Sequence, residues 1–270
     1  MQGASTLLHQ RPLYLRGRAC TYAEVDSQSA QRVCVRMHIR QDAEQYHDHE
    51  TDTFHMRIQF TSHIEAKVLQ NILASFMEAW SMQWSLHDAN EPMRTVIFCS
   101  KEGHCLNDLL FRWKTGLLRI DIRAIISNHS DFGQLAASYN VPFHHIPVTA
   151  ATKTEAELKQ LEVVRTEHAE LVVLARYMQI LSPRLCEELA GQVINIHHSF
   201  LPSFMGARPY HQAHARGVKL VGATAHYVTS ELDQGPIIEQ VCLMRPARSD
   251  TVCLLRTDDI LCARAIRLVL

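Results

Sequence analysis

The sequence is poor in the residues that build flexible segments and has no long apolar run. It holds ten glycines and nine prolines in 270 residues, whereas average usage would give about 32 of the two together. Long flexible linkers and low-complexity tails are therefore not expected, and no internal repeat is present. No stretch approaches the roughly 18 consecutive apolar residues of a membrane span, and the first 16 residues lack the apolar core of a signal peptide. We therefore expect a cytoplasmic globular protein with no membrane partner.

An excess of either charge is also missing. Lys and Arg total 27 and Asp and Glu total 28, which gives a formal net charge of −1. A general nucleic-acid binder normally carries a basic footprint, so we expect no nucleic-acid partner. With 47% hydrophobic residues, the chain can bury a sizeable core in one large domain or two small ones.

Several familiar catalytic and metal-binding motifs are absent. The eight cysteines include no Cys-x-x-Cys pair, and several lie in apolar runs, so we interpret them as reduced and mostly buried thiols. The 17 histidines include no His-Glu-x-x-His, and we predict no metal site. The sequence also lacks a Gly-x-Ser-x-Gly nucleophile elbow, a Gly-x-Gly-x-x-Gly turn and a Gly-x-x-x-x-Gly-Lys-Ser/Thr phosphate loop.

A polar segment with one proline, His87–Arg94, divides the chain and is typical of a linker. We predict a small α+β domain over residues 1–87, a linker over 88–93 and a second domain over 94–270.

The first domain contains β-like stretches and one clear helix. Ser62 and Glu65 have the spacing of a capping box, which predicts that the helix begins there. Apolar residues recur every fourth position after it and predict the buried face of the helix; they are Ile64, Val68, Ile72 and Phe76, with Leu69, Leu73 and Trp80 beside them.

Beyond residue 93 short apolar runs alternate with helical patterns. Strands are predicted at 95–99, 121–126, 171–175, 193–196, 221–228 and 236–243, and helices at 104–113, 132–139, 155–168 and 183–190. This order predicts a parallel sheet with helices on both faces. Ligands bind outside the carboxyl ends of the strands in such sheets, which directs attention to the segments after Ala175 and Ile196.

The densest polar segment, Ile194–Pro202, follows one of these strands. Asn195 and His197 are two residues apart, so their side chains share one side of the strand end. Together they can hold one carbonyl oxygen, and a protonated His197 would stabilise negative charge that develops on it. Spacing alone is more consistent with two residues whose hydrogen bonds are satisfied inside a turn at the end of the strand. Asp233 lies in a loop between two strands and, taken alone, is more typical of a turn residue.

Four segments in order resemble the formyltetrahydrofolate deformylase family of the folate-dependent formyltransferase superfamily. They are Ile194–Pro202, Gly206–Ala213, Gly222–Val228 and Leu232–Ile238, and the similarity extends to Val173–Leu181 and Ser100–Leu106. The resemblance spans roughly residues 94–265. It implies an α/β fold in which a small α+β domain, ferredoxin-like and of the ACT type, precedes a Rossmann-like formyltransferase domain with a mostly parallel sheet.

The resemblance also implies roles for single residues. The catalytic Asn, His and Asp of the superfamily fall on Asn195, His197 and Asp233. The implied substrate-binding residues lie mostly in the segment that lines the folate pocket; they are Arg176, Tyr177, Met178, Ile180, Leu181, Gly206, His226 and Gly235.

The first domain departs from the ACT pattern after Cys20. The family continues with Pro-Asp-x-x-Gly, whereas this chain has Thr21–Val25 without the Pro or the Gly. We therefore interpret it as a degenerate ACT-like domain and expect glycine or methionine to shift activity weakly or not at all. Because ACT units commonly pair, the resemblance implies a homo-oligomer.

The implied activity is hydrolysis of 10-formyltetrahydrofolate to tetrahydrofolate and formate, which would balance one-carbon pools and supply formate for purine synthesis. The folate is the small-molecule substrate, and neither a cofactor nor a metal is expected. Asp233 would position and deprotonate a water while Asn195 and His197 hold the oxyanion. A carboxylate near His197 would favour the charged form of its imidazole.

Two alternatives are formyl transfer to an amine and a non-catalytic regulator that senses folate or an amino acid. A ribonucleotide acceptor would need its phosphate held after the first strand of the second domain. The segment Ser100–Cys105 has one glycine there and carries Glu102, whose carboxylate would repel a phosphate. We therefore expect water to be the acceptor.

Overall fold

The computed structural model describes residues 11–19, 42–48, 53–62, 64–79, 82–88, 91–199, 201–203, 218, 220–244, 264 and 266. The chain forms two compact units, Met1–Glu91 and Pro92–Leu270. The division falls inside the predicted linker. Three predicted features lie outside the described residues: the altered segment after Cys20, Trp80 of the predicted helix face and the substrate contact at Gly206.

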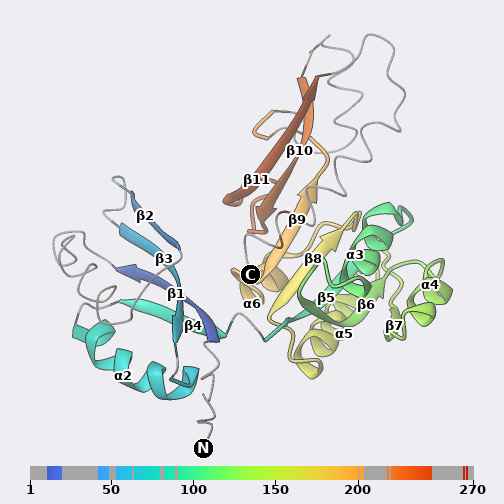
Figure 1. Cartoon of the computed structure of the whole chain (residues 1–270). Coiled ribbons are helices and arrows are strands. Elements are labelled where there is room, and N and C mark those ends of the chain that lie inside the picture. The colour runs from blue at the N-terminus through green and yellow to red at the C-terminus, as the bar shows by residue number, and fades with distance from the viewer. Residues whose placement is uncertain are drawn as a thin grey trace, which may run out of the picture. The chain divides into compact units, whose positions relative to one another are not determined.

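The first unit contains a four-stranded antiparallel sheet in the order β2-β3-β1-β4 and one described helix (Figure 1). Its elements are β1 Arg11–Ala19, β2 Asp42–Asp48, β3 Thr53–Ser62, α2 Ala66–Ala79 and β4 Gln83–Asp88. The sequence patterns missed β1, β2 and β4. Leu13 and Leu15 alternate as in a strand, but Pro12 and the basic neighbours weaken that signal. Because β4 runs to Asp88, the connection to the second unit is shorter than predicted.

Helix α2 buries only part of the predicted apolar face. Leu69, Leu73 and Met77 are buried together with Ile58 and Phe60 of β3. Leu69 and Leu73 belong to the predicted face, but Ile64, Val68 and Ile72 remain 42–50% exposed, so the prediction was wrong for these three residues.

The predicted capping box was also wrong, because Ser62 is the last residue of β3. Its Oγ accepts a hydrogen bond from the Ile64 N–H at 3.0 Å, two residues on, before α2 begins at Ala66. Two apolar rows lie side by side on this helix. Packing against the sheet determines which of the two rows is buried.

The second unit is a seven-stranded sheet in the order β11-β10-β9-β8-β5-β6-β7. Its strands are β5 Met93–Cys99, β6 Ile120–Ser127, β7 Phe143–His145, β8 Leu171–Ala175, β9 Val193–His197, β10 Leu220–Tyr227 and β11 Ile237–Met244. The five strands from β9 to β7 pair in parallel, and β10 and β11 pair antiparallel. The predicted mostly parallel sheet is confirmed, and the short strand β7 is an addition to it.

Helices cover both faces of this sheet (Figure 1). They are α3 His104–Lys114, α4 Gly133–Ser138, α5 Lys153–Thr166 and α6 Pro183–Glu188. Alternate residues of one strand enter different cores: Ile97 packs with the apolar residues of α3 and α4, and Phe98 packs with those of α5 and α6. Burying each such side chain contributes about 1.5–3 kcal/mol, so both faces need a helical layer. The structure thereby confirms the predicted three-layer arrangement.

Helix α6 begins as the sequence suggests. Pro183 occupies the first turn, and the Leu185 N–H donates to the Ser182 Oγ at 3.3 Å. Because α6 begins at Pro183, the segment between Ala175 and Ser182 connects β8 to this helix. It lies at the carboxyl ends of the strands. This segment borders the candidate site.

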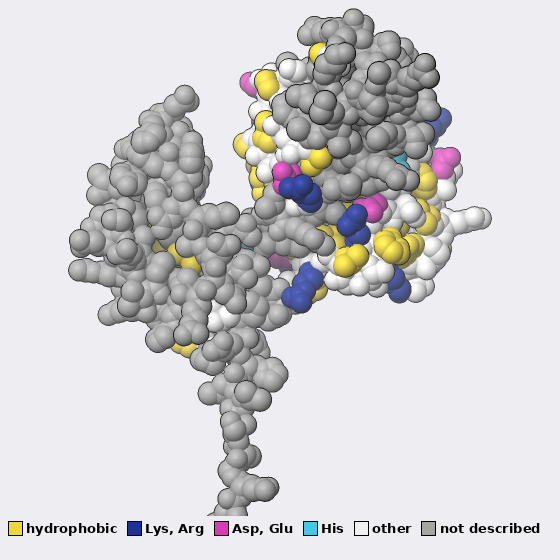
Figure 2. Space-filling model, turned by 45° about the horizontal axis from the view of Figure 1, so that its top comes forward, with side chains coloured by type: hydrophobic (Ala, Val, Ile, Leu, Met, Phe, Trp, Pro, Cys, Tyr) yellow, Lys and Arg dark blue, Asp and Glu magenta, His cyan; other side chains and the backbone are white. Residues whose placement is uncertain are grey.

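Within the described ranges, no helix is long and apolar enough to cross a bilayer. In the view of Figure 2, basic and acidic side chains are interspersed with hydrophobic ones.

Candidate active site

Two polar side chains point to one side at the end of β9. Asn195 and His197 both line a pocket of about 280 Å³, as their two-residue spacing predicts. The neighbours Ile194 and Ile196 are buried in the apolar core. Strand β9 therefore holds an amide and an imidazole rigidly at the pocket wall.

Strand β10 adds His226 directly across from Asn195. The two residues are partners in the antiparallel ladder, and the distance between Asn195 Nδ2 and His226 Nε2 is 3.2 Å. The other ring nitrogen, Nδ1, lies 2.9 Å from the Tyr227 carbonyl oxygen. Burial lowers the pKa of His226, so its neutral form is favoured.

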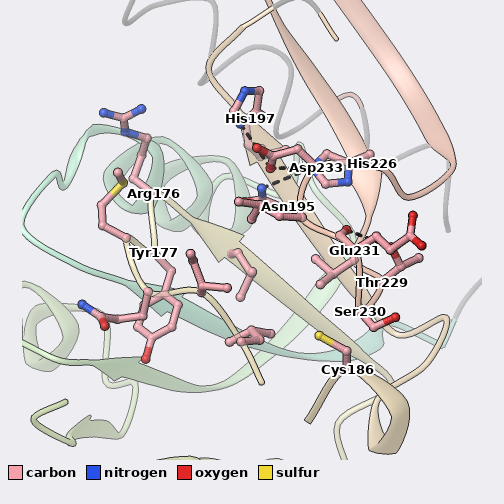
Figure 3. Close-up of a pocket in the computed structure, with 18 of the residues that line it drawn as sticks. Arg176, Tyr177, Cys186, Asn195, His197, His226, Thr229, Ser230, Glu231 and Asp233 are labelled. Atoms are coloured by element: carbon pink, nitrogen blue, oxygen red, sulfur yellow. Dashed lines mark hydrogen bonds and ion pairs between the residues drawn. The ribbon is translucent and has the colours of Figure 1, made fainter. Parts of the chain in front are cut away.

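Asp233 reaches the same place from the loop between β10 and β11. Its Oδ1 lies 3.4 Å from His197 Nδ1 and 3.8 Å from His226 Nε2 (Figure 3). The carboxylate is almost completely buried. Asp233 has a φ of 58°, in the left-handed region that Asp tolerates better than most residues.

Gly235 lets this loop return closely against β10. A Cβ at this position would lie 1.7 Å from the Tyr227 carbonyl oxygen, which no side chain can do without moving the backbone. The same carbonyl receives the His226 Nδ1–H, and the Tyr227 N–H donates to the Pro236 oxygen at 2.9 Å. Gly235 does not line the pocket, so its position indicates a role in packing rather than the predicted substrate contact.

The segment after β8 forms the opposite wall. Arg176, Tyr177, Met178, Ile180 and Leu181 all line the pocket, as predicted. Met178 is 55% exposed and Ile180 is 61% exposed, and Leu232 across the pocket is 50% exposed. Apolar side chains left open around a polar centre are typical of a site that an aromatic or apolar ligand covers.

Tyr177 differs from its neighbours because its ring is anchored in the core. Gln160 Nε2 donates to its hydroxyl at 2.8 Å, and the ring meets Phe98 edge-on with centroids 5.3 Å apart. Burial raises the pKa of the Tyr177 phenol to about 12. Its phenol therefore stabilises the pocket wall and takes no part in proton transfer near neutral pH.

The structure also brings His198 and Ser100 to this site, and the sequence patterns had missed the role of Ser100. His198 also lines the pocket; burial, together with the charges of Arg176, His197 and His104, lowers its pKa to about 3. Ser100 Oγ donates to Asn128 Oδ1 at 2.7 Å and accepts from the Met178 N–H at 3.0 Å. Its place directly after β5, at the edge where ligands bind, was the available signal.

Three cysteines in the described part of the chain, Cys99, Cys105 and Cys186, are buried and form no disulfide, as predicted. Burial raises the pKa of the Cys99 thiol to about 11. No three His, Cys, Asp or Glu side chains of the described residues are grouped to hold a metal ion.

Comparison with known proteins agrees with this architecture. The formyl transferase family model matches residues 93–252. A formyltetrahydrofolate deformylase from Corynebacterium sp. strain P-1 is 48% identical over 202 residues, which cover 74% of this chain and 71% of that protein.

Solved structures extend the similarity to the first unit. The crystal structure of a formyltetrahydrofolate deformylase from Pseudomonas syringae pv. tomato has 37% identity and a TM-score of 0.88, and the match covers 97% of this chain and 90% of that one. A phosphoribosylglycinamide formyltransferase from Anaplasma phagocytophilum matches with 29% identity and a TM-score of 0.60 over 66% of this chain and 86% of that one.

The parallel sheet and the site at its carboxyl edge define the second unit as a formyl transferase domain. The whole chain belongs to the formyltetrahydrofolate deformylase family.

Proposed function

We propose that the protein hydrolyses 10-formyltetrahydrofolate to tetrahydrofolate and formate. The observation that carries this function is the buried Asp233 carboxylate, 3.4 Å from His197 and beside Asn195, in a pocket with an apolar rim. Family membership supports the same reaction, because the relatives with this architecture are named for it.

The three polar groups can divide the chemistry of hydrolysis between them. Asp233 takes a proton from water as the water oxygen bonds to the formyl carbon. Asn195 and His197 hold the oxygen that becomes negatively charged. The bond from the formyl carbon to N10 then breaks, N10 takes up a proton, and formate and tetrahydrofolate are released. These steps need no cofactor and no metal.

The pocket wall supports a folate as the bound molecule. A pterin ring is flat and apolar on its faces, and Met178, Ile180 and Leu232 offer apolar surface that such a ring would cover. Arg176 and the polar loop residues Thr229–Glu231 lie on the same pocket. We propose that these side chains orient the folate so that its formyl group faces Asn195.

Formyl transfer to an amine is less well supported. Beside the start of α3, the ring of Phe132 packs directly on Gly103, with ring carbons 2.3 and 2.4 Å from where a Cβ would be. The apolar ring thus occupies one side of the partly exposed Gly103 and narrows the space for a phosphate there. Glu102 is exposed next to it, and its charge would repel a phosphate group.

The remaining proposals rest on family resemblance. We propose that the first unit is a degenerate ACT-like domain with little response to amino acids and that the protein forms a homo-oligomer in the cytoplasm. Formate from the reaction would balance one-carbon pools and supply purine synthesis.

The test is formate release from 10-formyltetrahydrofolate with no amine acceptor present. We expect release without an acceptor, an unchanged rate when glycinamide ribonucleotide is added, and no formylated ribonucleotide. Formylation of the ribonucleotide at a rate comparable with hydrolysis would show that the protein is a transferase and not a hydrolase. Folate binding without turnover in either assay would indicate a sensing protein.

A further inference from the structure

We propose that His226 is the positioning residue for Asn195: it is a neutral imidazole whose unprotonated Nε2 accepts a hydrogen bond from Asn195 and so sets the orientation of the carboxamide. This inference deepens the proposed function, because the orientation matters for catalysis only if Asn195 holds the formyl oxygen. It differs from the substrate contact that the family resemblance implied for His226.

The Tyr227 carbonyl decides which ring nitrogen carries the proton. A carbonyl oxygen can only accept a hydrogen bond, and His226 Nδ1 lies 2.9 Å from it, so Nδ1 carries a hydrogen. A neutral imidazole has only one N–H, which leaves Nε2 with a lone pair. His226 is 2% exposed, and burial disfavours the second proton that would make both nitrogens donors.

The lone pair on Nε2 then selects one end of the Asn195 carboxamide. Only the amide nitrogen carries hydrogens, and Asn195 Nδ2 lies 3.2 Å from His226 Nε2. Turning the carboxamide over would place its oxygen against the lone pair, which is repulsive. With one N–H directed at His226, the second N–H of the same amide can donate to the formyl oxygen.

The backbone reinforces this pairing. Asn195 and His226 are directly opposed in the antiparallel ladder between β9 and β10, so the distance between their Cα atoms is set by the sheet. A cross-strand pair of this kind loses little conformational freedom when the substrate binds. The orientation of Asn195 is therefore prepared before the substrate arrives.

The geometry also argues against His226 acting on Asp233. The distance from His226 Nε2 to Asp233 Oδ1 is 3.8 Å, which exceeds a hydrogen bond, and an unprotonated Nε2 has no hydrogen to donate. His197 Nδ1 is closer to the same carboxylate oxygen, at 3.4 Å. The site thus consists of two pairs, Asn195 with His226 and His197 with Asp233.

Two substitutions at one position test the hydrogen-bond acceptor. His226→Phe keeps a ring but removes the acceptor, and we expect kcat to fall by about 10²-fold with KM nearly unchanged. His226→Gln places an oxygen near the position of Nε2, so we expect recovery to within about tenfold of the native rate. Equal losses for both variants, or a loss mainly in KM, would contradict a positioning role. Thermal unfolding of both variants shows whether His226→Phe has simply lost its fold.

A double-mutant cycle separates action through Asn195 from any other role. In an Asn195→Ala background, His226→Phe should cost no more than about threefold, because the group that it positions is already gone. A full additional loss of about 10²-fold would show that His226 acts on Asp233 or on the substrate.

A final readout does not depend on activity. Nitrogen NMR of protein labelled in histidine, with His226 assigned from the His226→Gln spectrum, should show a neutral ring protonated on Nδ1 at pH 7. A charged ring, or a proton on Nε2, would overturn the proposal even in an active enzyme. If the native protein releases no formate but shows this tautomer, the proposed function fails while the pairing of His226 with Asn195 stands.

Discussion

The two sides of the site are built in different ways. Asn195, His197 and His226 stand on adjacent strands, and the hydrogen-bonded ladder between β9 and β10 places them. Asp233 stands on a loop, where a left-handed backbone at Asp233 and a close approach at Gly235 place it. The strand-borne groups are therefore fixed by regular structure, whereas the loop-borne carboxylate depends on a few special backbone positions. This difference predicts which substitutions damage chemistry alone and which damage geometry.

The largest effect is expected at the loop carboxylate itself. Asp233→Asn is nearly isosteric and should keep the fold, but it removes the group that takes the proton from water. We expect kcat for formate release to fall by about 10²–10⁴-fold. The measurement is steady-state kinetics together with thermal unfolding. Activity near the native rate would remove Asp233 from the mechanism and leave the strand-borne groups to carry it.

Gly235→Ala tests whether the loop depends on its backbone. The added Cβ would meet the Tyr227 carbonyl oxygen, so the loop must shift and carry Asp233 with it. We expect a fall of about 10²-fold in kcat and a loss of about 1–3 kcal/mol in the free energy of unfolding.

Gly133→Ala is the matched control for this substitution. A Cβ there meets only the Phe143 ring at 3.5 Å, an ordinary contact, and the residue opens helix α4. Its activity should stay within about twofold of native, since Ala is favoured over Gly in helices. Equal effects of the two substitutions would show that the loop geometry at Gly235 has no special importance.

The apolar rim should affect binding more than chemistry. Ile180→Ser removes apolar surface that a bound folate would cover, and we expect KM to rise by about tenfold with kcat little changed. Leu117→Ser is a control at a similarly exposed leucine, 53% exposed, that does not line the pocket. If both variants bind folate like the native protein, the substrate does not cover Ile180.

The smallest effect concerns acid stability rather than catalysis. The pKa of His198 is lowered to about 3 in the folded protein, against about 6.5 when unfolded. Between these values the unfolded chain binds a proton that the folded chain does not, so stability falls as pH drops below about 6.5. His198→Asn should reduce the loss between pH 7.5 and pH 5 by on the order of 2 kcal/mol. Denaturant unfolding at both pH values measures this difference, and an unchanged loss would contradict it.

Regular periodicity predicted the second unit well because its strands are nearly all apolar. Leu171–Ala175 is buried along its whole length, and its predicted bounds match those of β8. The first unit was harder to predict, since helix α2 carries two adjacent apolar rows and the sequence does not say which row meets the sheet. The Ser62 signal was likewise ambiguous, because a hydroxyl beside a nearby N–H forms a turn as readily as a cap.

The sequence by itself determined the alternation of strands and helices, the side shared by Asn195 and His197, and the family to which these motifs point. All three rest on local patterns; strand geometry, for example, sends residues two apart to the same side. Only the tertiary structure decided that His226 meets Asn195 across two strands and that Asp233 comes within 3.4 Å of His197. Strand register and the return of a loop against a carbonyl depend on contacts between segments far apart in the chain, and no local pattern records those contacts.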